Sequence, residues 1–321
     1  MLPRVADPGY AAALLDICAQ EGIQALFPGL DPELEPLSRL SDALRALGCE
    51  LICSAPAAIR LLRNKLACSE FFTPLDLPFA PTLPLARVEE VLDLGGFPIV
   101  VKPLGGSASR GVHVVFSRAE LDKLSADGTL GAEVAYIVQP FLVPVGLGKR
   151  RNQLRREDVY ANHALVQDDE CTVQVIVDRD GAPLGHMTCR SLLKDGAVIR
   201  MRPCQPDLAG VTGKALKMAG HLAGLGLLGP CNFQSRLTPD GPVFYEINPR
   251  CSGGTGGRAM LGFNEVEACL RRLALGSSLE EARACLKPRF DQVCAWHPAE
   301  LLMAAGDIET LRQGGAVQPR G

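Results

Sequence analysis

The stretch that decides the fold is Tyr245-Glu246-Ile247-Asn248-Pro249-Arg250, at the end of a predicted strand. Side chains alternate between the two faces of a strand. Three polar side chains, Glu246, Asn248 and Arg250, are therefore expected on one face. The apolar side chains of Tyr245 and Ile247 are expected to point into the core. A carboxylate, an amide oxygen and a guanidinium would then converge on one surface.

A second strand precedes this one, and the two predict a metal site. The strand Cys231–Leu237 is followed by Thr238-Pro239-Asp240-Gly241, a strong turn signal. A hairpin at this turn would bring Gln234 near Glu246. Oxygen donors of this kind suit Mg²⁺, which uses few protein ligands and completes its shell with phosphate and water. Gln234, Glu246 and Asn248 are thus the predicted metal ligands, and Arg250 would neutralise phosphate charge. The alternative is a solvated polar strand face.

A candidate phosphate site lies earlier in the chain. The apolar strand Phe97–Lys102 ends in a lysine and is followed by the glycine-rich segment 105–111. Glycines let backbone N–H groups approach phosphate oxygens, and Lys102 would add a point charge. The segment is not a Walker loop, because G-x-x-x-x-G-K-[ST] is absent. By itself it could equally be a flexible hairpin.

Together these motifs resemble the ATP-grasp superfamily, in particular its carbamoyl-phosphate-synthase-like and amino-acid-ligase branch. The resemblance covers roughly residues 1–275 and includes Asn64-Lys65, IVQPFL (137–142) and ECTVQVIVDRDG (170–181). The resemblance implies that ATP and Mg²⁺ are the cofactors and that Mn²⁺ could replace Mg²⁺. It also implies that two magnesium ions bridge the ATP phosphates. The implied nucleotide-binding residues are Lys65, Lys102, Gly105, Gly106, Ser107 and Gly111 at the phosphates and lid, Gln139, Phe141 and Leu142 at the adenine hinge, and Glu170 at the ribose.

The expected fold class is α/β: an α+β ATP-grasp module preceded by a partial parallel-sheet, Rossmann-like domain. The order helix, strand, helix, strand in the first sixty residues predicts the parallel sheet. The expected division is residues 1–63 for the partial domain, 64–275 for the ATP-grasp domain with a lid subdomain at about 95–141, and 276–321 for a C-terminal extension. The chain opens on a helix, so the usual first strand and glycine-rich turn are expected to be missing.

Helical periodicity adds detail that the structure can test. Ala12, Leu15 and Cys18 are expected on the buried side of the first helix. Leucines spaced at 34, 37, 40, 44 and 47 predict one helix closed by Gly48. A further helix is expected from about Phe263 to Leu275.

Two departures from the family pattern concern the hinge and an insertion. The hinge has Gln139-Pro140 where the family often has an acidic residue. Residues 143–169 replace a short link and contain the basic side chains Lys149, Arg150, Arg151, Arg155 and Arg156. The insertion is either a solvated loop, or a basic lid over an anionic substrate, or a dock for an acidic carrier protein.

Composition sets limits on partners. The 321 residues carry a formal net charge of −3, which gives no basic excess for nucleic acid. No run of 18 apolar residues suggests a membrane span, and no apolar leader follows Met1, so a cytoplasmic location is expected. Twelve scattered cysteines without C-x-x-C spacing predict reduced, mostly buried thiols. A homodimer is a further expectation.

The predicted function is an ATP-dependent carboxylate–amine ligase that forms an amide through an acyl-phosphate. Its substrates would be a small carboxylic or amino acid and an amine. The predicted catalytic residues are Lys102, Arg190 and Arg250, with Arg190 holding a substrate carboxylate or the acyl-phosphate. Three alternatives stay open: phosphorylation of bicarbonate or carbamate, a nucleotide-binding regulatory subunit without turnover, and a structural α/β protein that binds no nucleotide.

Overall fold

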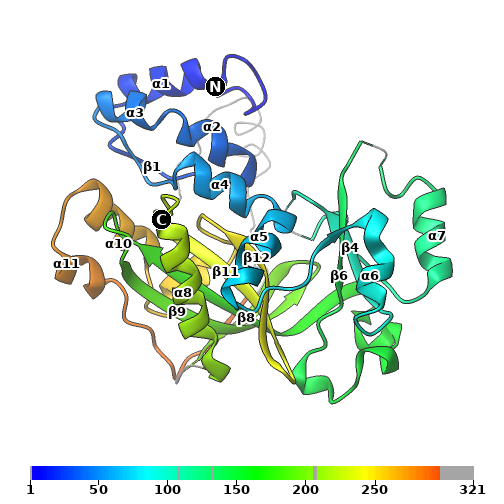
Figure 1. Ribbon diagram of the computed structural model, residues 1–321. Coiled ribbons are helices and arrows are strands. Elements are labelled where there is room, and N and C mark those ends of the chain that lie inside the picture. Colours follow the sequence, from blue (N-terminus) through cyan, green and yellow to red (C-terminus); the bar gives the residue numbers. More distant parts are fainter. Residues whose placement is uncertain (1, 107–108, 132, 205–207, 297–321) are drawn as a thin grey trace, which may run out of the picture.

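The computed structural model describes residues 2–106, 109–131, 133–204 and 208–296, which form an N-terminal unit, a small sheet and a large sheet (Figure 1). The two strands of the N-terminal unit pair in parallel. This confirms the predicted parallel sheet, which has two strands. Its elements are α1 (Tyr10–Gln20), β1 (Ala25–Leu26), η1 (Asp31–Glu33), α2 (Leu34–Ser38), α3 (Ser41–Ala46) and β2 (Glu50–Leu51).

Two helix predictions in this unit are wrong in detail. The buried face of α1 carries Tyr10, Leu14 and Cys18, spaced four residues apart, whereas Ala12 is exposed. The bulk of the Tyr10 ring fixes which side of the helix turns inward. The leucine-rich segment is two helices instead of one, because the Leu40 N–H bonds to the Leu37 carbonyl three residues back and ends the α-helical ladder.

The small sheet is antiparallel, with strand order β3-β6-β4-β5 and helices α6 and α7 beside it (Figure 1). Val100 of β4 lies between Gln139 of β6 and Val114 of β5. The segment leading into and through this lobe comprises α4 (Pro56–Leu62), α5 (Lys65–Phe72), η2 (Thr73–Leu75), β3 (Leu83–Pro84), η3 (Leu85–Arg87), α6 (Val88–Leu92), β4 (Ile99–Pro103), β5 (His113–Val115), α7 (Arg118–Ala126) and β6 (Tyr136–Pro140).

The large sheet has the order β12-β11-β8-β9-β10-β13, with β7 paired to β8. Two strands of this sheet were not expected from the sequence: β10, which forms a hairpin with β9, and the short β13, which pairs with β10. The strands are β7 (Tyr160–Ala161), β8 (Ala164–Val177), β9 (Pro183–Lys194), β10 (Ala197–Pro203), β11 (Gly229–Thr238), β12 (Gly241–Asn248) and β13 (Cys294–Ala295).

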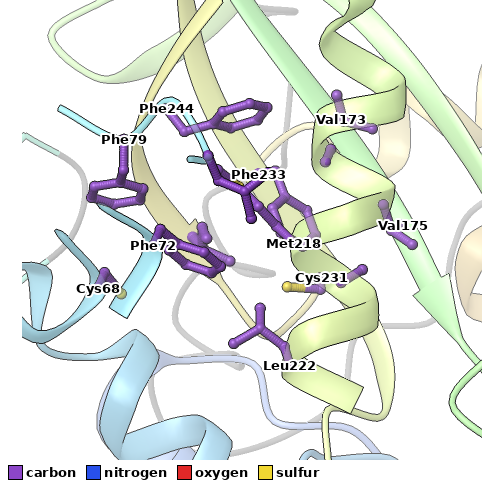
Figure 2. Close-up of a cluster of buried hydrophobic side chains, with 14 of the residues drawn as sticks. Cys68, Phe72, Phe79, Val173, Val175, Met218, Leu222, Cys231, Phe233 and Phe244 are labelled. Atoms are coloured by element: carbon purple, nitrogen blue, oxygen red, sulfur yellow. The ribbon is translucent and has the colours of Figure 1, made fainter. Parts of the chain in front are cut away.

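Helices α5 and α8 (Val211–Ala223) cover one face of the large sheet and enclose the main core (Figure 2). Phe72 stacks on Phe79, with ring centroids 5.7 Å apart. Phe233 and Phe244 meet edge to face at 6.5 Å. These four rings tie α5 to β11 and β12, the two strands that carry the predicted metal ligands.

The other face of the large sheet is covered at one end only. There α9 (Thr255–Met260), α10 (Glu265–Cys269), the π-helix η8 (Leu270–Ala274) and α11 (Leu279–Ala284) pack on it. The helix expected over 263–275 therefore begins two residues later and ends in a π-turn. Residues 279–295 add a helix and an edge strand to this large sheet. The proposed division of the chain into domains stays a prediction.

The insertion 143–169 contains several short elements and is not a plain loop. It contains η4 (Val145–Leu147), η5 (Arg151–Gln153), η6 (Arg156–Asp158), β7 and the start of β8. Leu154 and Val159 are buried against Phe141 and Val114. Single apolar residues scattered among charges leave no periodic signal, which is why this small core was missed.

Two general features complete the fold. Within the described residues, no helix combines the length and the hydropathy that crossing a bilayer requires. All twelve cysteines are free thiols and most are buried, which confirms the expectation of reduced, packed cysteines.

Candidate functional site

A cavity of about 380 Å³ lies between the small sheet, the uncovered end of the large sheet and the N-terminal unit. The small sheet lends it a mostly apolar wall that includes Val100, Val114 and Phe141. The large sheet lends polar and charged side chains. The N-terminal unit adds Gly29 and Leu30 from the loop before η1 and Asp31 from the start of η1. One side of the cavity can therefore hold a flat apolar ring, while the other can hold a charged group.

The three predicted metal ligands are all brought to this cavity. Gln234 and Glu246 face each other across the β11–β12 pair, as the hairpin predicted, and Asn248 follows two residues later opposite Asn232. Glu246 Oε1 lies 3.9 Å from Lys65 Nζ. The set offers one carboxylate and two amide oxygens, a hard-oxygen group that fits Mg²⁺ only when phosphate oxygens share it.

A β-bulge corrects the prediction for Tyr245. The pairing runs Gln234 with Glu246 and then Ser235 with Phe244, so Tyr245 is skipped in the register. The extra residue turns Tyr245 into the cavity lining instead of the core. The core position is taken by Phe244, which is fully buried.

Two lysines from separate elements line the cavity. Lys65 begins α5, where the Asn64 side chain caps the helix by accepting a hydrogen bond from the Ala67 N–H at 3.0 Å. Lys102 lies on β4 with its Nζ 5.2 Å from the centre of the Tyr245 ring. Burial, helped by the nearby charge of Lys65, lowers the pKa of Lys102 to about 7. An incoming anion would therefore restore a proton to this lysine.

The glycine-rich segment after β4 contributes only in part as predicted. Gly105 and Gly106 line the cavity, and so do Ser109 and Arg110, which were not assigned. Gly111 is not in the lining. Its φ is +70°, and a Cβ there would lie 3.0 Å from Pro103 Cγ, so it serves the turn. Ser107 falls outside the described residues.

The residues of the predicted adenine hinge line the cavity, but Glu170, the predicted ribose ligand, does not. Gln139, Phe141 and Leu142 are all in the wall. Glu170 is fully buried and accepts a hydrogen bond from Arg236 Nη2 at 3.0 Å, so its predicted ribose contact is wrong. Burial raises the pKa of Glu170, and the Arg236 charge opposes this rise.

Arg236 is a site residue that sequence reasoning did not assign. It lines the cavity, and its Nη1 donates to the Leu142 carbonyl at 3.2 Å. Arg236 therefore links the buried Glu170 carboxylate to the backbone of the hinge at Leu142. The signal was available, since Arg236 shares the period of Asn232 and Gln234 along β11.

Arg190 does not belong to this site. On β9 it pairs with Cys171 of β8 and with Arg202 of β10, and Cys171 belongs to the core under α8. Directly paired residues project from the same face of a sheet. Arg190 thus lies on the face away from the cavity, and its predicted catalytic role is wrong.

Arg250 lines the cavity but is held by a partner from the N-terminal unit. Its Nε and Nη2 donate to the two carboxylate oxygens of Asp31 at 2.5 and 2.9 Å, and its Nη1 donates to the Cys251 carbonyl at 2.8 Å. Arg63 Nη1 lies 3.2 Å from the same carboxylate. The Asp31 side chain is only 2% exposed. This fork-to-fork pair fixes the guanidinium plane at the cavity edge.

Comparisons with known proteins agree with this fold. A family described as "PylC-like, N-terminal domain" matches residues 1–52. The large chain of carbamoyl phosphate synthase from Methanobrevibacter smithii is 22% identical over 287 residues, 86% of this chain. A biotin carboxylase complex with a β,γ-ATP ligand from Campylobacter jejuni has a TM-score of 0.65 at 18% identity, over 89% of this chain and 62% of that one.

These similarities define the chain as having the ATP-grasp fold, and they confirm the resemblance on which the sequence analysis relied. An L-amino acid ligase from Bacillus licheniformis shares the fold with a TM-score of 0.60 and 17% identity, over 89% of this chain and 65% of that one. The chain spans 25% of the carbamoyl phosphate synthase large chain, so it corresponds to one section of that larger protein.

Proposed function

We propose that the chain is an ATP- and Mg²⁺-dependent carboxylate–amine ligase that forms an amide through an acyl-phosphate. One observation carries the proposal: a single cavity gathers Gln234, Glu246 and Asn248 with Lys65 and Lys102 beside an apolar wall. The apolar wall suits a purine, the lysines suit a triphosphate, and the oxygens suit a divalent cation. The fold shared with an L-amino acid ligase supports the same reaction class.

The residues divide the work as follows. Lys65 and Lys102 would hold the phosphates, and Gln234, Glu246 and Asn248 would hold Mg²⁺, which when bound neutralises charge on the transferred phosphoryl group. A substrate carboxylate oxygen attacks the γ-phosphorus and ADP leaves. The amine then attacks the acyl carbon, phosphate leaves, and the amine loses a proton. Such a reaction depends on positioning and electrostatics more than on a side-chain nucleophile.

Arg250 is the proposed anchor for the reacting carboxylate. Three of its five N–H groups are used by Asp31 and the Cys251 carbonyl. The remaining N–H groups are available to a carboxylate or to the acyl-phosphate at the cavity edge. Ser252 and Gly253, which also line this edge, add backbone groups near the same place.

The proposal is tested by ADP release from purified protein with Mg-ATP, a panel of amino acids and small carboxylic acids, and a panel of amines. We expect ADP release that requires both a carboxylate and an amine, with the amide detected by mass spectrometry. Bicarbonate-dependent ADP release without an amine would favour carbamoyl-phosphate-like chemistry instead. Tight ATP binding with no turnover on any pair would favour the regulatory alternative.

Nucleotide affinity is expected to depend on pH through Lys102. The free-protein pKa of Lys102 is about 7, and bound phosphates favour the charged lysine, so binding takes up a proton above pH 7. The affinity for Mg-ATP should then fall by up to about tenfold per pH unit above pH 7. Calorimetry in buffers of different ionisation enthalpy at pH 8 should detect about one proton taken up per nucleotide.

The matched variant is Lys102→Arg, whose side chain stays charged throughout this range. It should bind Mg-ATP without the extra proton. An equal proton uptake in the wild type and in Lys102→Arg would show that another group is responsible.

Three expectations about cofactors and partners remain predictions. They are that Mn²⁺ can replace Mg²⁺, that the chain forms a homodimer, and that an acidic carrier protein binds it. Two basic side chains of the insertion already have ion-pair partners: Lys149 pairs with Asp158 inside the insertion at 2.6 Å, and Arg156 pairs with Glu120 of α7 at 2.9 Å. Those two side chains are therefore less available to a partner than the sequence suggested.

A further inference from the structure

A buried ion pair behind the cavity edge has no place in the reaction described above. Arg258 of α9 donates from Nε to Glu265 Oε2 at 3.1 Å and from Nη2 to Glu265 Oε1 at 2.7 Å. Arg258 is 2% exposed and Glu265 is fully buried. A buried ion pair adds little stability over an apolar pair of the same size, because both charges must be taken out of water. Stability alone is therefore a poor explanation for this pair.

The ion pair is bonded to the loop that joins β12 to α9. Arg258 Nη2 also donates to Ser252 Oγ and to Thr255 Oγ1, both at 3.0 Å. Thr255 Oγ1 accepts a hydrogen bond from the Ser252 backbone N–H at 3.0 Å and donates one to Glu265 Oε1. Ser252 is thus held at its backbone and at its side chain by groups that the ion pair fixes.

The loop lies so close to Arg258 that it leaves no room for a side chain at Gly254. A Cβ there would lie 2.9 Å from Arg258 Nη1 and 2.5 Å from Met201 Cε. The loop backbone therefore rests directly on the guanidinium, and the position of Ser252 depends on that of Arg258.

The bonds of Ser252 Oγ determine how its hydroxyl can act. The oxygen accepts from Arg258 Nη2 at 3.0 Å and from the Gly254 N–H at 3.3 Å. Neither a guanidinium nor a backbone N–H can accept a hydrogen bond, so the hydroxyl hydrogen points at neither of them. In the described part of the chain this hydrogen has no acceptor, and Ser252 lines the cavity. The hydroxyl is therefore available as a donor to an anion in the cavity.

The Ser252 hydroxyl lies at the same edge of the cavity as the proposed carboxylate anchor. Arg250 and Ser252 both line the cavity, and Arg250 Nη1 donates to the carbonyl of the intervening Cys251 at 2.8 Å. The N–H groups of Arg250 that remain free and the hydroxyl of Ser252 are thus donors on one short, internally bonded segment.

We propose that the Ser252 hydroxyl donates a hydrogen bond to the substrate carboxylate and to the acyl-phosphate made from it, and that Arg258 and Thr255 are the positioning residues that hold it there. The inference rests on the proposed ligase function. Hydrogen bonds to an ionised acceptor are roughly twice as strong as those between neutral groups. The bond that Ser252 Oγ accepts from the Arg258 cation polarises the hydroxyl further and makes it a better donor.

The test measures initial rates of ADP release with the most active carboxylic acid and amine of the panel described above. Ser252→Ala should raise the KM for the carboxylic acid about tenfold, the size expected for losing one hydrogen bond to a charged group, and should leave the KM for ATP unchanged. Thr188→Val is the matched control, because Thr188 of β9 has a buried hydroxyl that bonds to Thr212 of α8 at 2.7 Å, on the other face of the sheet. This control should lower the melting temperature without changing either KM.

Replacing the ion pair by apolar residues separates positioning from stability. The double variant Arg258→Met with Glu265→Leu should fold, because apolar residues of similar volume can replace a buried ion pair, and it should raise the same KM about tenfold. Adding Ser252→Ala to it should raise this KM no further, since the hydroxyl would already be displaced. If the double variant does not fold, Thr255→Val takes its place with the same expected rise. Thr255→Ser keeps the hydroxyl and should retain the wild-type KM.

The outcomes distinguish this inference from the proposed function. An unchanged carboxylic-acid KM in Ser252→Ala, or a rise in the KM for ATP instead, would overturn the inference and leave the proposed function intact. A wild-type KM in the folded apolar variant, or a further rise on adding Ser252→Ala to it, would overturn the positioning role of Arg258. Absence of ADP release by the wild type with every pair of substrates would overturn both the inference and the proposed function.

Discussion

Glu246→Gln is expected to lower carboxylate-dependent ADP release by about 10³-fold, the size of effect typical of removing one charge-stabilising group from an active site. Glu246 supplies the only carboxylate of the three oxygen donors in the cavity, beside Gln234 and Asn248. The substitution keeps the shape of the side chain and removes its charge. The remaining set would be neutral and would hold a divalent cation far less well against two repelling lysines.

The measurement is ADP release at saturating and at low Mg²⁺, together with thermal unfolding. Within the part of the chain that the structure describes, the ion pair of Glu246 is the 3.9 Å pair with Lys65, and its side chain is 19% exposed, so the fold should persist. Glu280→Gln, at an exposed position on α11, is the matched control and should retain wild-type activity. Full turnover by Glu246→Gln would refute the assignment of a metal to this cavity.

Asp31→Asn is expected to lower the free energy of unfolding by about 3 kcal/mol, because it leaves a partly buried arginine pair without its counter-charge. Asp31 accepts both bonds of the Arg250 fork and lies close to Arg63. It joins the N-terminal unit to the end of β12. The same change should raise the KM for the carboxylate substrate more than the KM for ATP, since Arg250 would lose its fixed orientation.

Urea denaturation and initial-rate kinetics measure the two effects. Asp42→Asn is the control for an exposed pair: Asp42 bonds Arg45 at 3.0 Å, but its side chain is 98% exposed. That variant should change the free energy of unfolding by less than about 0.5 kcal/mol. If Asp31→Asn were no more destabilising than Asp42→Asn, the pair would not couple the N-terminal unit to the site.

The sequence predicted the hairpin of β11 and β12 well, and the reason is local. A turn of fixed length sets the register of an antiparallel pair, and the period of two then decides which side chains share a face. Gln234 therefore meets Glu246 as expected. The same rule failed at Tyr245, because the bulge there skips one residue and so reverses which face the side chain occupies. The residue types around the bulge gave no sign of it.

Other misses have a common origin in the choice of face. Alternation says that Arg190 and its neighbours on β9 point to opposite sides, but it does not say which side carries the cavity. The large sheet has a helix-covered face and a partly open face, and both bury apolar residues. Arg190 lies on the covered face and Arg236 on the open one, and only the packing of α8 distinguishes them.

What the sequence determined by itself was most of the longer helices and strands, the hairpin register and the types of side chain available for phosphate and metal, because these depend on spacing within a few residues. Only the tertiary structure decided the partners that join distant segments. Asp31 bonds Arg250 across 219 positions, Thr82 bonds Gln139 across 57, and Glu170 bonds Arg236 across 66. Such pairs form only when separate sheets and the N-terminal unit pack together, and no local rule of the chain encodes that geometry.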